Sequence, residues 1–145
     1  MDELVRWLGE QLDTDEQVAR DATMGPWQNA PTASHYATAT GQTEEAVFAS
    51  PPDVGTVVVA STGEARDRKN LRNAEHIVRF ADPARVLREI DAKRRIIAEV
   101  VPEARKAEAM INEEWGSGSD TDGDLLRLLA LPYANRPGYR EEWRP

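Results

Sequence analysis

The sequence contains no cysteine in its 145 residues. This absence excludes disulfides, thiolate zinc sites, iron–sulfur clusters and cysteine nucleophiles. The chain also lacks any apolar run close to the roughly 20 residues that a membrane-spanning helix needs. Its first residues show no signal-peptide pattern. We therefore expect a cytoplasmic protein that does not contact a membrane.

Histidine is scarce, and recognisable catalytic motifs are missing. His35 and His76 are too few for a zinc site unless carboxylates complete it. Residues 120–124, Asp-Thr-Asp-Gly-Asp, place glycine fourth and Leu131 twelfth, which does not fit a calcium loop and is typical of a turn that caps a helix. No phosphate-binding glycine motif and no nucleophile elbow is present. We expect no catalytic residue, no cofactor and no metal ion.

Positive charge is concentrated in the middle of the chain, although the net charge is −8. Residues 25–62 hold no lysine or arginine, whereas residues 63–106 hold twelve basic and eight acidic residues. Arg72, His76 and Arg79 share one helix face and form a candidate interaction site. We favour the interpretation that they pair with the acidic first helix. The alternative is a nucleic-acid-binding patch that also contains Arg85, Arg88, Arg94 and Arg95.

The first part of the chain predicts a long helix followed by a sharp corner. Apolar residues recur at helical spacing from Asp2 to about Thr23. Gly25 and Pro26 should end this helix, because the residue before a proline avoids the helical region. Trp27 follows directly and should place its ring on the core, so we interpret Gly25, Pro26 and Trp27 as a structural corner.

A small sheet is predicted after the corner. The β-branched run Gly55–Ser61 is the best strand, Glu45–Ala49 is a second candidate, and Ser34–Thr40 is a third. The short connections favour antiparallel pairing. We expect two or three strands.

The second half of the chain is predicted to be helical. One helix begins near Asn70, and Asp82-Pro83 has the pattern of an N-cap and first-turn proline that begin a longer helix reaching Trp115. Such a helix would be about 50 Å long, which exceeds a compact domain of this size. Because Pro102 removes a backbone donor, we expect a break or sharp kink within two residues of Val101.

The aromatic residues and the last helix complete the expected core. Trp7 and Trp115 lie on or beside apolar helix stripes and should be in the core or at its rim. Residues Asp124–Leu131 are apolar nearly all round, so this short helix should be buried. Tyr139 and Trp143 are candidate interaction residues that dock either onto the domain itself or onto a partner.

These patterns predict an α+β fold with a long N-terminal helix, a small antiparallel sheet and a helical C-terminal half. We expect one domain over residues 1–131 and an aromatic-containing tail over residues 132–145. The chain should be a monomer or a weak dimer.

Several segments together resemble a known family. They are Ala22–Trp27, Asn73–Ile77, Asp82–Ile90, Ala92–Ile96, Leu131–Tyr133 and Pro137–Pro145. This combination resembles DUF6221, a family of small uncharacterised actinobacterial and actinophage proteins, although Met24 stands where that family usually has proline. A more distant similarity is to phage early-region proteins of the Ea22 type. The resemblance implies a phage or mobile-element context and carries over no activity and no catalytic residue.

The missing catalytic motifs and the resemblance favour a nonenzymatic accessory protein that binds a host or phage protein. A nucleic-acid-binding protein that uses the central arginines is one alternative, disfavoured by the acidic net charge. A metal-dependent hydrolase built on carboxylates is another.

Overall fold

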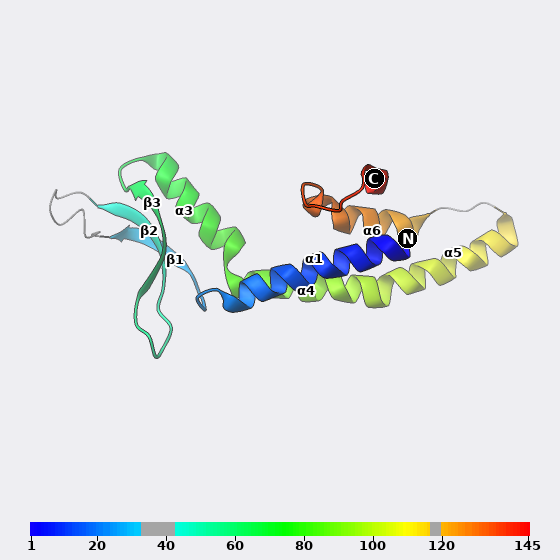
Figure 1. The fold of residues 1–145 in the computed structure, drawn as a ribbon, viewed down its shortest axis with the longest axis horizontal. Helices are drawn as coiled ribbons and strands as arrows, with labels where there is room; N and C mark the ends of the chain where they lie inside the picture. Colours follow the sequence, from blue (N-terminus) through cyan, green and yellow to red (C-terminus); the bar gives the residue numbers. More distant parts are fainter. Residues whose placement is uncertain (33–42, 117–119) are drawn as a thin grey trace. The chain divides into compact units, whose positions relative to one another are not determined.

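The structure, a computed structural model, describes residues 1–32, 43–116 and 120–145. Helices and one antiparallel sheet give an α+β fold, which confirms the prediction (Figure 1). The chain divides into two compact units. The helical unit contains residues 1–16 and 89–145, and the sheet unit contains residues 17–88. Residues 132–145 are part of the helical unit, and the division at residue 131 stays a prediction.

The sheet unit holds three antiparallel strands in the order β1-β2-β3. They are β1 (Gln28–Thr32), β2 (Glu44–Ala49) and β3 (Val57–Glu64). The predictions for β2 and β3 are confirmed, whereas Ser34–Thr40 lies outside the described residues. The sequence did not predict β1, since Pro31 and polar residues weaken its strand pattern and its pairing with β2 alone makes it a strand.

Helix α3 (Arg68–Ala81) packs against all three strands of the sheet. Ala74 is fully buried, so a small side chain marks the face that α3 turns inward. The carboxylate of Asp67 accepts a hydrogen bond from the backbone N–H of Lys69 at 2.8 Å. This N-cap begins the helix two residues before the predicted start at Asn70.

The predicted corner is present, and Asp82 holds it. Gly25 and Pro26 are joined by a cis peptide bond. The backbone N–H of Trp27 donates to Oδ2 of Asp82 at 2.9 Å, and its indole N–H donates to the carbonyl of Thr23 at 2.8 Å. The corner is therefore fixed by hydrogen bonds as well as by the partly buried ring of Trp27.

Asp82 also begins the next helix, α4 (Pro83–Arg95). Its Oδ1 accepts from the backbone N–H groups of Ala84 at 3.0 Å and Arg85 at 3.2 Å. The predicted N-cap and first-turn proline are thus confirmed. One oxygen of the Asp82 carboxylate therefore accepts hydrogen bonds at the start of α4, and the other accepts a hydrogen bond at the corner.

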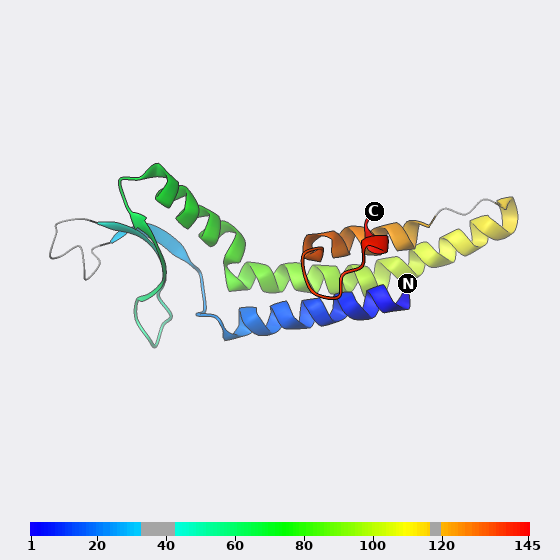
Figure 2. The same ribbon diagram turned by 45° about the horizontal axis from the view of Figure 1, so that its top comes forward.

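The helical unit is built from residues 2–16 of α1, residues 89–95 of α4, and the helices that follow. Their bounds are α1 (Asp2–Asp21), α4 as above, η1 (Ile96–Val100), α5 (Val101–Trp115), α6 (Thr121–Ala130), η2 (Leu131–Tyr133) and η3 (Glu141–Trp143). Leu4, Leu8 and Leu12 are at most 1% exposed and form the buried stripe of α1. In both views α1 lies beside α4 within this unit (Figures 1 and 2).

Of the break or sharp kink predicted within two residues of Val101, the structure shows no break. Val100 and Val101 keep right-handed helical backbone angles, and α4, η1 and α5 follow one path without turning back (Figure 2). The segment η1 is a π-helical turn, in which the N–H of Val101 donates to the carbonyl of Ile96 five residues earlier. This wider turn gives the ring of Pro102 room that a regular α-helical turn would not give, so the chain continues as a helix.

Helix α6 is buried on one side only, which corrects the expectation of a helix buried all round. Leu126 and Ala130 are fully buried, whereas Leu128 is 55% exposed. The helix begins at Thr121, before the predicted Asp124, and therefore includes polar residues in its first turn.

The tail aromatics pack against the first helix of the same unit. The ring centroid of Trp7 lies 5.6 Å from that of Tyr139 and 5.3 Å from that of Trp143. The indole N–H of Trp7 donates to the carbonyl of Pro137 at 3.1 Å. Trp7 and Trp143 are 7% and 8% exposed, so the expectation for Trp7 is confirmed and the tail is part of the core.

We expect truncation of Trp7 to destabilise the helical unit strongly. Trp7→Ala removes two ring contacts and a hydrogen bond and should lower the free energy of unfolding by about 3–5 kcal/mol. Trp115→Ala is the matched control, because Trp115 is 74% exposed and should change stability by less than about 0.5 kcal/mol. Urea unfolding followed by circular dichroism at low protein concentration measures both, and equal losses would contradict this packing.

A pair of glycine substitutions tests the corner. A Cβ at Gly25 would lie 2.5 Å from Oδ2 of Asp82, the atom that accepts from Trp27. Gly25→Ala should therefore displace that bond and cost about 1–2 kcal/mol of unfolding free energy. Gly9→Ala, in the middle of α1 with no atom within 4 Å of the new Cβ, should stabilise by about 0.5–1 kcal/mol. A thermal melt of each variant measures the two opposite shifts.

Candidate functional site

The predicted residues Arg72, His76 and Arg79 line one hollow of about 560 Å³ in the sheet unit. They come from successive turns of α3, so the predicted common face is confirmed. Other residues that line the hollow are Asn29, Glu75, Val78 and Phe80. The hollow therefore combines cationic, amide and apolar groups.

Two of these residues have partners on their own helix, and their expected pairing with the acidic first helix stays a prediction. Arg72 pairs with Glu75 on its own helix at 2.5 Å. The ring of His76 lies 4.7 Å from that of Phe80.

A second hollow, of about 450 Å³, adjoins the first at Val78 and Arg79. Its lining includes Pro26 and Asp82 from the corner, together with Arg85 and Arg88 from the start of α4. We use the name arginine surface for Arg72, His76, Arg79, Phe80, Arg85 and Arg88. The corner held by Asp82 therefore positions the α4 side of this surface.

The centre of the arginine surface is an aromatic ring between cations. Phe80 is 50% exposed. The guanidinium carbon of Arg85 lies 4.8 Å from its ring centroid, and Arg85 also donates to the carbonyl of Arg79. Cation–ring contacts of this kind fix the orientation of an arginine at a surface.

A buried carboxylate lies next to the first hollow. Glu45 on β2 is 1% exposed, and its Oε1 accepts a hydrogen bond from Nδ2 of Asn29 at 2.7 Å. Because Glu45 orients the side-chain amide of Asn29, the hollow has a positioned polar group beside its cations. The sequence predicts a strand at Glu45 but not the burial of its carboxylate, since a glutamate in a strand is ordinarily exposed.

Arg94, expected in the alternative nucleic-acid patch, is instead paired inside the helical unit. It contacts Asp13 at 2.6 Å and also Glu16, both on α1. The hydrogen bond to Glu16 raises the pKa of Arg94, burial opposes this, and the bond to Asp13 adds to the rise. Arg95 pairs with Glu99 one turn later. Arg94 therefore pairs with the acidic first helix.

Of the two alternatives for Tyr139 and Trp143, the structure shows docking onto the chain itself. Their rings contact each other at 5.9 Å and contact Trp7 as described above. The hydroxyl of Tyr139 is buried and has no hydrogen-bond partner among the described residues. These residues therefore contribute to the core of the helical unit, and their side chains do not form an exposed surface.

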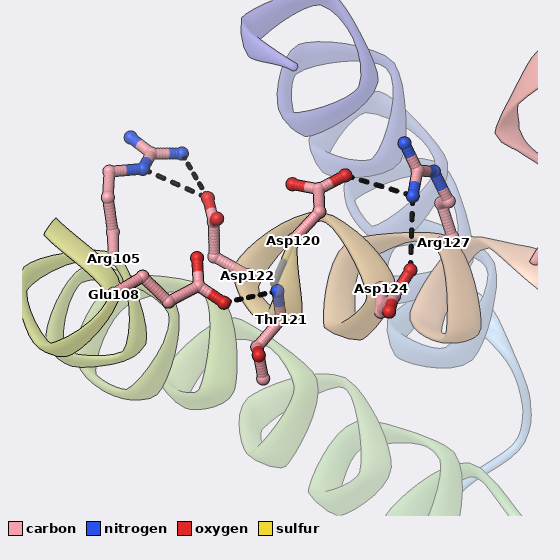
Figure 3. A network of polar contacts seen from close by, with 7 residues as sticks. All are labelled: Arg105, Glu108, Asp120, Thr121, Asp122, Asp124 and Arg127. Carbon is pink, nitrogen blue, oxygen red and sulfur yellow. Dashed lines mark hydrogen bonds and ion pairs between the residues drawn. The ribbon is translucent and has the colours of Figure 1, made fainter. Parts of the chain in front are cut away.

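Residues 120–124 form ion pairs, where the sequence suggested capping aspartates (Figure 3). Asp122 accepts from Arg105 of α5 at 2.9 and 3.0 Å, and Asp120 and Asp124 both contact Arg127. Asp120 makes no side-chain capping bond. Among the described residues, no group of three or more metal-ligating side chains could hold an ion.

Two opposed effects set the protonation of Asp122. Burial disfavours its charged form, but hydrogen bonding, above all from Arg105, outweighs burial and lowers its pKa below the ordinary 3.8. The carboxylate of Glu108 accepts from the backbone N–H of Thr121 (Figure 3). The network therefore fastens the beginning of α6 to α5.

The sequence interpretation missed an exposed apolar face. Trp115, expected in the core or at its rim, is 74% exposed, and Met110 is 71% exposed. Both lie near the end of α5. The apolar spacing is visible in the sequence. The sequence does not show, however, that these side chains are exposed in the described structure.

The comparisons with known proteins give a family and no activity. A family model described as "Family of unknown function (DUF6221)" matches residues 1–145. No curated protein and no solved structure matches the chain.

We expect the ion pair of Asp122 to make stability depend on acid pH. Its folded-state pKa lies below the unfolded value, so its contribution is present above about pH 4 and is lost as the pH falls through the folded pKa. Asp122→Asn should lower the unfolding free energy by about 1–2 kcal/mol at pH 7, and the difference from wild type should shrink below pH 4. Urea titrations from pH 7 to pH 2.5 measure this. Arg105→Gln should add nothing to Asp122→Asn, and additive losses would contradict a direct pair.

Proposed function

The chain belongs to the DUF6221 family, a family of unknown function, and we propose that it is a noncatalytic accessory protein that binds another protein through the arginine surface. The observation that carries this proposal is a pair of available guanidinium groups. Within the part of the chain that the structure describes, the side chains of Arg79 and Arg88 have no hydrogen-bond or ion-pair partner. Planar guanidinium groups bind carboxylates with two parallel hydrogen bonds. The matching partner is an acidic protein segment.

The centre of the surface favours a protein partner. Phe80 is half-exposed and lies between His76 and Arg85. Aromatic residues and arginine are enriched at protein interfaces and often supply most of the binding energy. A nucleic acid would instead favour a broad basic field.

The distribution of charge also disfavours nucleic acid. Residues 17–88 carry eight acidic and eight basic residues, so the whole net charge of −8 lies on the helical unit. A polyanion would be repelled by this field at low salt, whereas an acidic segment of limited length meets mainly the local arginines. Fluorescence anisotropy with a labelled duplex at low salt tests the nucleic-acid alternative directly.

The remaining parts of the proposal concern context. We place the protein in the cytoplasm, and in a phage or mobile-element setting, on the basis of its cysteine-free sequence and of the resemblance to actinophage and Ea22-type proteins. Neighbouring phage genes around its coding sequence would support that setting. The metal-dependent hydrolase stays a hypothesis, and a thermal shift induced by magnesium, manganese, calcium or zinc would support it.

We expect charge reversal at the arginine surface to abolish partner capture. Arg79→Glu/Arg88→Glu should reduce the retained partner at least about tenfold, because each charge-assisted hydrogen bond contributes about 1.5–3 kcal/mol. The measurement is a pull-down from a lysate of the source cells, quantified by mass spectrometry against wild type.

Arg95→Glu/Arg144→Glu is the matched control, with the same change in net charge at two exposed positions of the helical unit. This variant should retain the partner as wild type does. Equal losses in both variants would indicate a nonspecific charge effect, and retention by both would contradict the proposed surface. Circular dichroism confirms that each variant is folded.

A further inference from the structure

The side-chain amide of Asn29 is held in one orientation at the wall of the first hollow. Its Nδ2 donates a hydrogen bond to Oε1 of the buried Glu45 at 2.7 Å. An ionised carboxylate only accepts hydrogen bonds, so the nitrogen of the amide faces Glu45 and the carbonyl oxygen points elsewhere. Among the described residues, Oδ1 of Asn29 accepts no hydrogen bond, and it is not a buried atom. The hollow therefore holds an open acceptor of fixed orientation.

The register of β1 and β2 brings these two side chains together. Asn29 pairs with Val47, and Pro31 pairs with Glu45. Asn29 and Glu45 are therefore diagonal neighbours on one face of the sheet, close enough for long polar side chains to meet. The first hollow combines Asn29 with residues of α3, so this face is the one against which α3 packs.

The burial of Glu45 favours a role beyond stability. The two buried acids of the described structure are Glu45 and Asp122. Asp122 is paired with Arg105, whereas Glu45 forms no ion pair within the described ranges and bonds the amide of Asn29. A carboxylate buried without a cation is costly, and an apolar side chain in its place would avoid that cost. The contact that Glu45 makes in return is the one that orients Asn29.

Building on the proposed function, which supplies an acidic partner segment, we infer that the first hollow binds the main chain of that segment through Asn29. Oδ1 and the second hydrogen of Nδ2 form an acceptor and a donor side by side. The N–H and C=O of one extended residue point to the same side and form the matching pair. Ionised carboxylates offer acceptors alone, so they do not satisfy Oδ1. Asn29 therefore selects an acidic peptide over a polyanion without amide groups.

The cations beside Asn29 bind the acidic side chain that follows or precedes this peptide group. The guanidinium of Arg79 has no partner among the described residues. Arg72 pairs with Glu75, but the side chains of this pair are 68% and 42% exposed, and exposed pairs of this kind contribute little and exchange readily. Main chain and side chain of one segment are thus bound in the same hollow, the first by an amide and the second by guanidinium groups.

Two synthetic peptides of equal charge test this assignment. One is hexaglutamate with an N-terminal fluorescein and an amidated C-terminus, and the other carries a methyl group on every main-chain nitrogen and offers no N–H to Oδ1. Fluorescence anisotropy at low salt measures the binding of each. Asn29→Ala should weaken the binding of hexaglutamate about tenfold and that of the methylated peptide less than about twofold, because the methylated peptide lacks the contact already.

Substitutions of Glu45 test its positioning role. Glu45→Leu leaves the amide of Asn29 without its acceptor and should reproduce the effect of Asn29→Ala on hexaglutamate. Its melting temperature should stay within a few degrees of wild type, because a buried carboxylate is replaced by an apolar side chain. Glu45→Gln keeps an acceptor oxygen and should bind as wild type does. Asn73→Ala, at an exposed position of α3 outside the lining of the hollow, is the matched control and should change neither affinity.

The possible outcomes separate this inference from the proposed function. Equal losses of both peptides in Asn29→Ala, together with loss of both in Arg79→Glu/Arg88→Glu, would overturn the main-chain contact and leave the arginine surface supported. Wild-type affinity of Glu45→Leu for hexaglutamate would overturn the positioning role of Glu45. Hexaglutamate that does not bind, or that binds Arg79→Glu/Arg88→Glu as tightly as wild type, would overturn the proposed surface and the main-chain contact together.

Discussion

The carboxylate of Asp82 is the contact on which the arrangement of the sheet unit depends. One oxygen accepts from the backbone of Trp27 at the corner, and the other accepts from the first N–H groups of α4. Trp27 lies 55 residues before Asp82 in the sequence, whereas Ala84 and Arg85 lie two and three residues after it. The hydrogen bonds fix the chain direction at both the corner and the start of α4, next to the second hollow. Because Gly25 has no Cβ, the carboxylate can approach the corner closely enough to make them.

The central basic block divides into two groups with different roles. Arg94 is neutralised by two carboxylates of α1 and stabilises the helical unit. Arg79 and Arg88 both line the second hollow, and within the described residues their side chains form no ion pair. Sequence charge alone does not separate these roles, because both groups lie on helices with more basic than acidic residues. Arg94 is distinguished by its contacts with α1 inside the helical unit.

The long helix shows how an unfavourable residue is accommodated. A proline in a regular helix loses one hydrogen bond and clashes with the carbonyl four residues earlier. In this chain the π-helical turn η1 lies directly before Pro102 and widens the helix there. The helix therefore continues to Trp115 and leaves its last turns exposed.

Local chemistry in the sequence determined the α+β class, the long first helix, two of the three strands, the corner at Gly25–Trp27 and the start of α4 at Asp82. It also placed Arg72, His76 and Arg79 on one face, because helical spacing fixes which side chains share a face. The tertiary structure decided the strand at Pro31, the packing of Tyr139 and Trp143 against Trp7 and the exposure of Trp115. Each of these depends on a contact between segments distant in sequence, or on the lack of one. The continuity through Pro102 depends on the π-helical turn that precedes it. An apolar side chain favours burial wherever it occurs, but only the packing of the other elements decides whether it is covered.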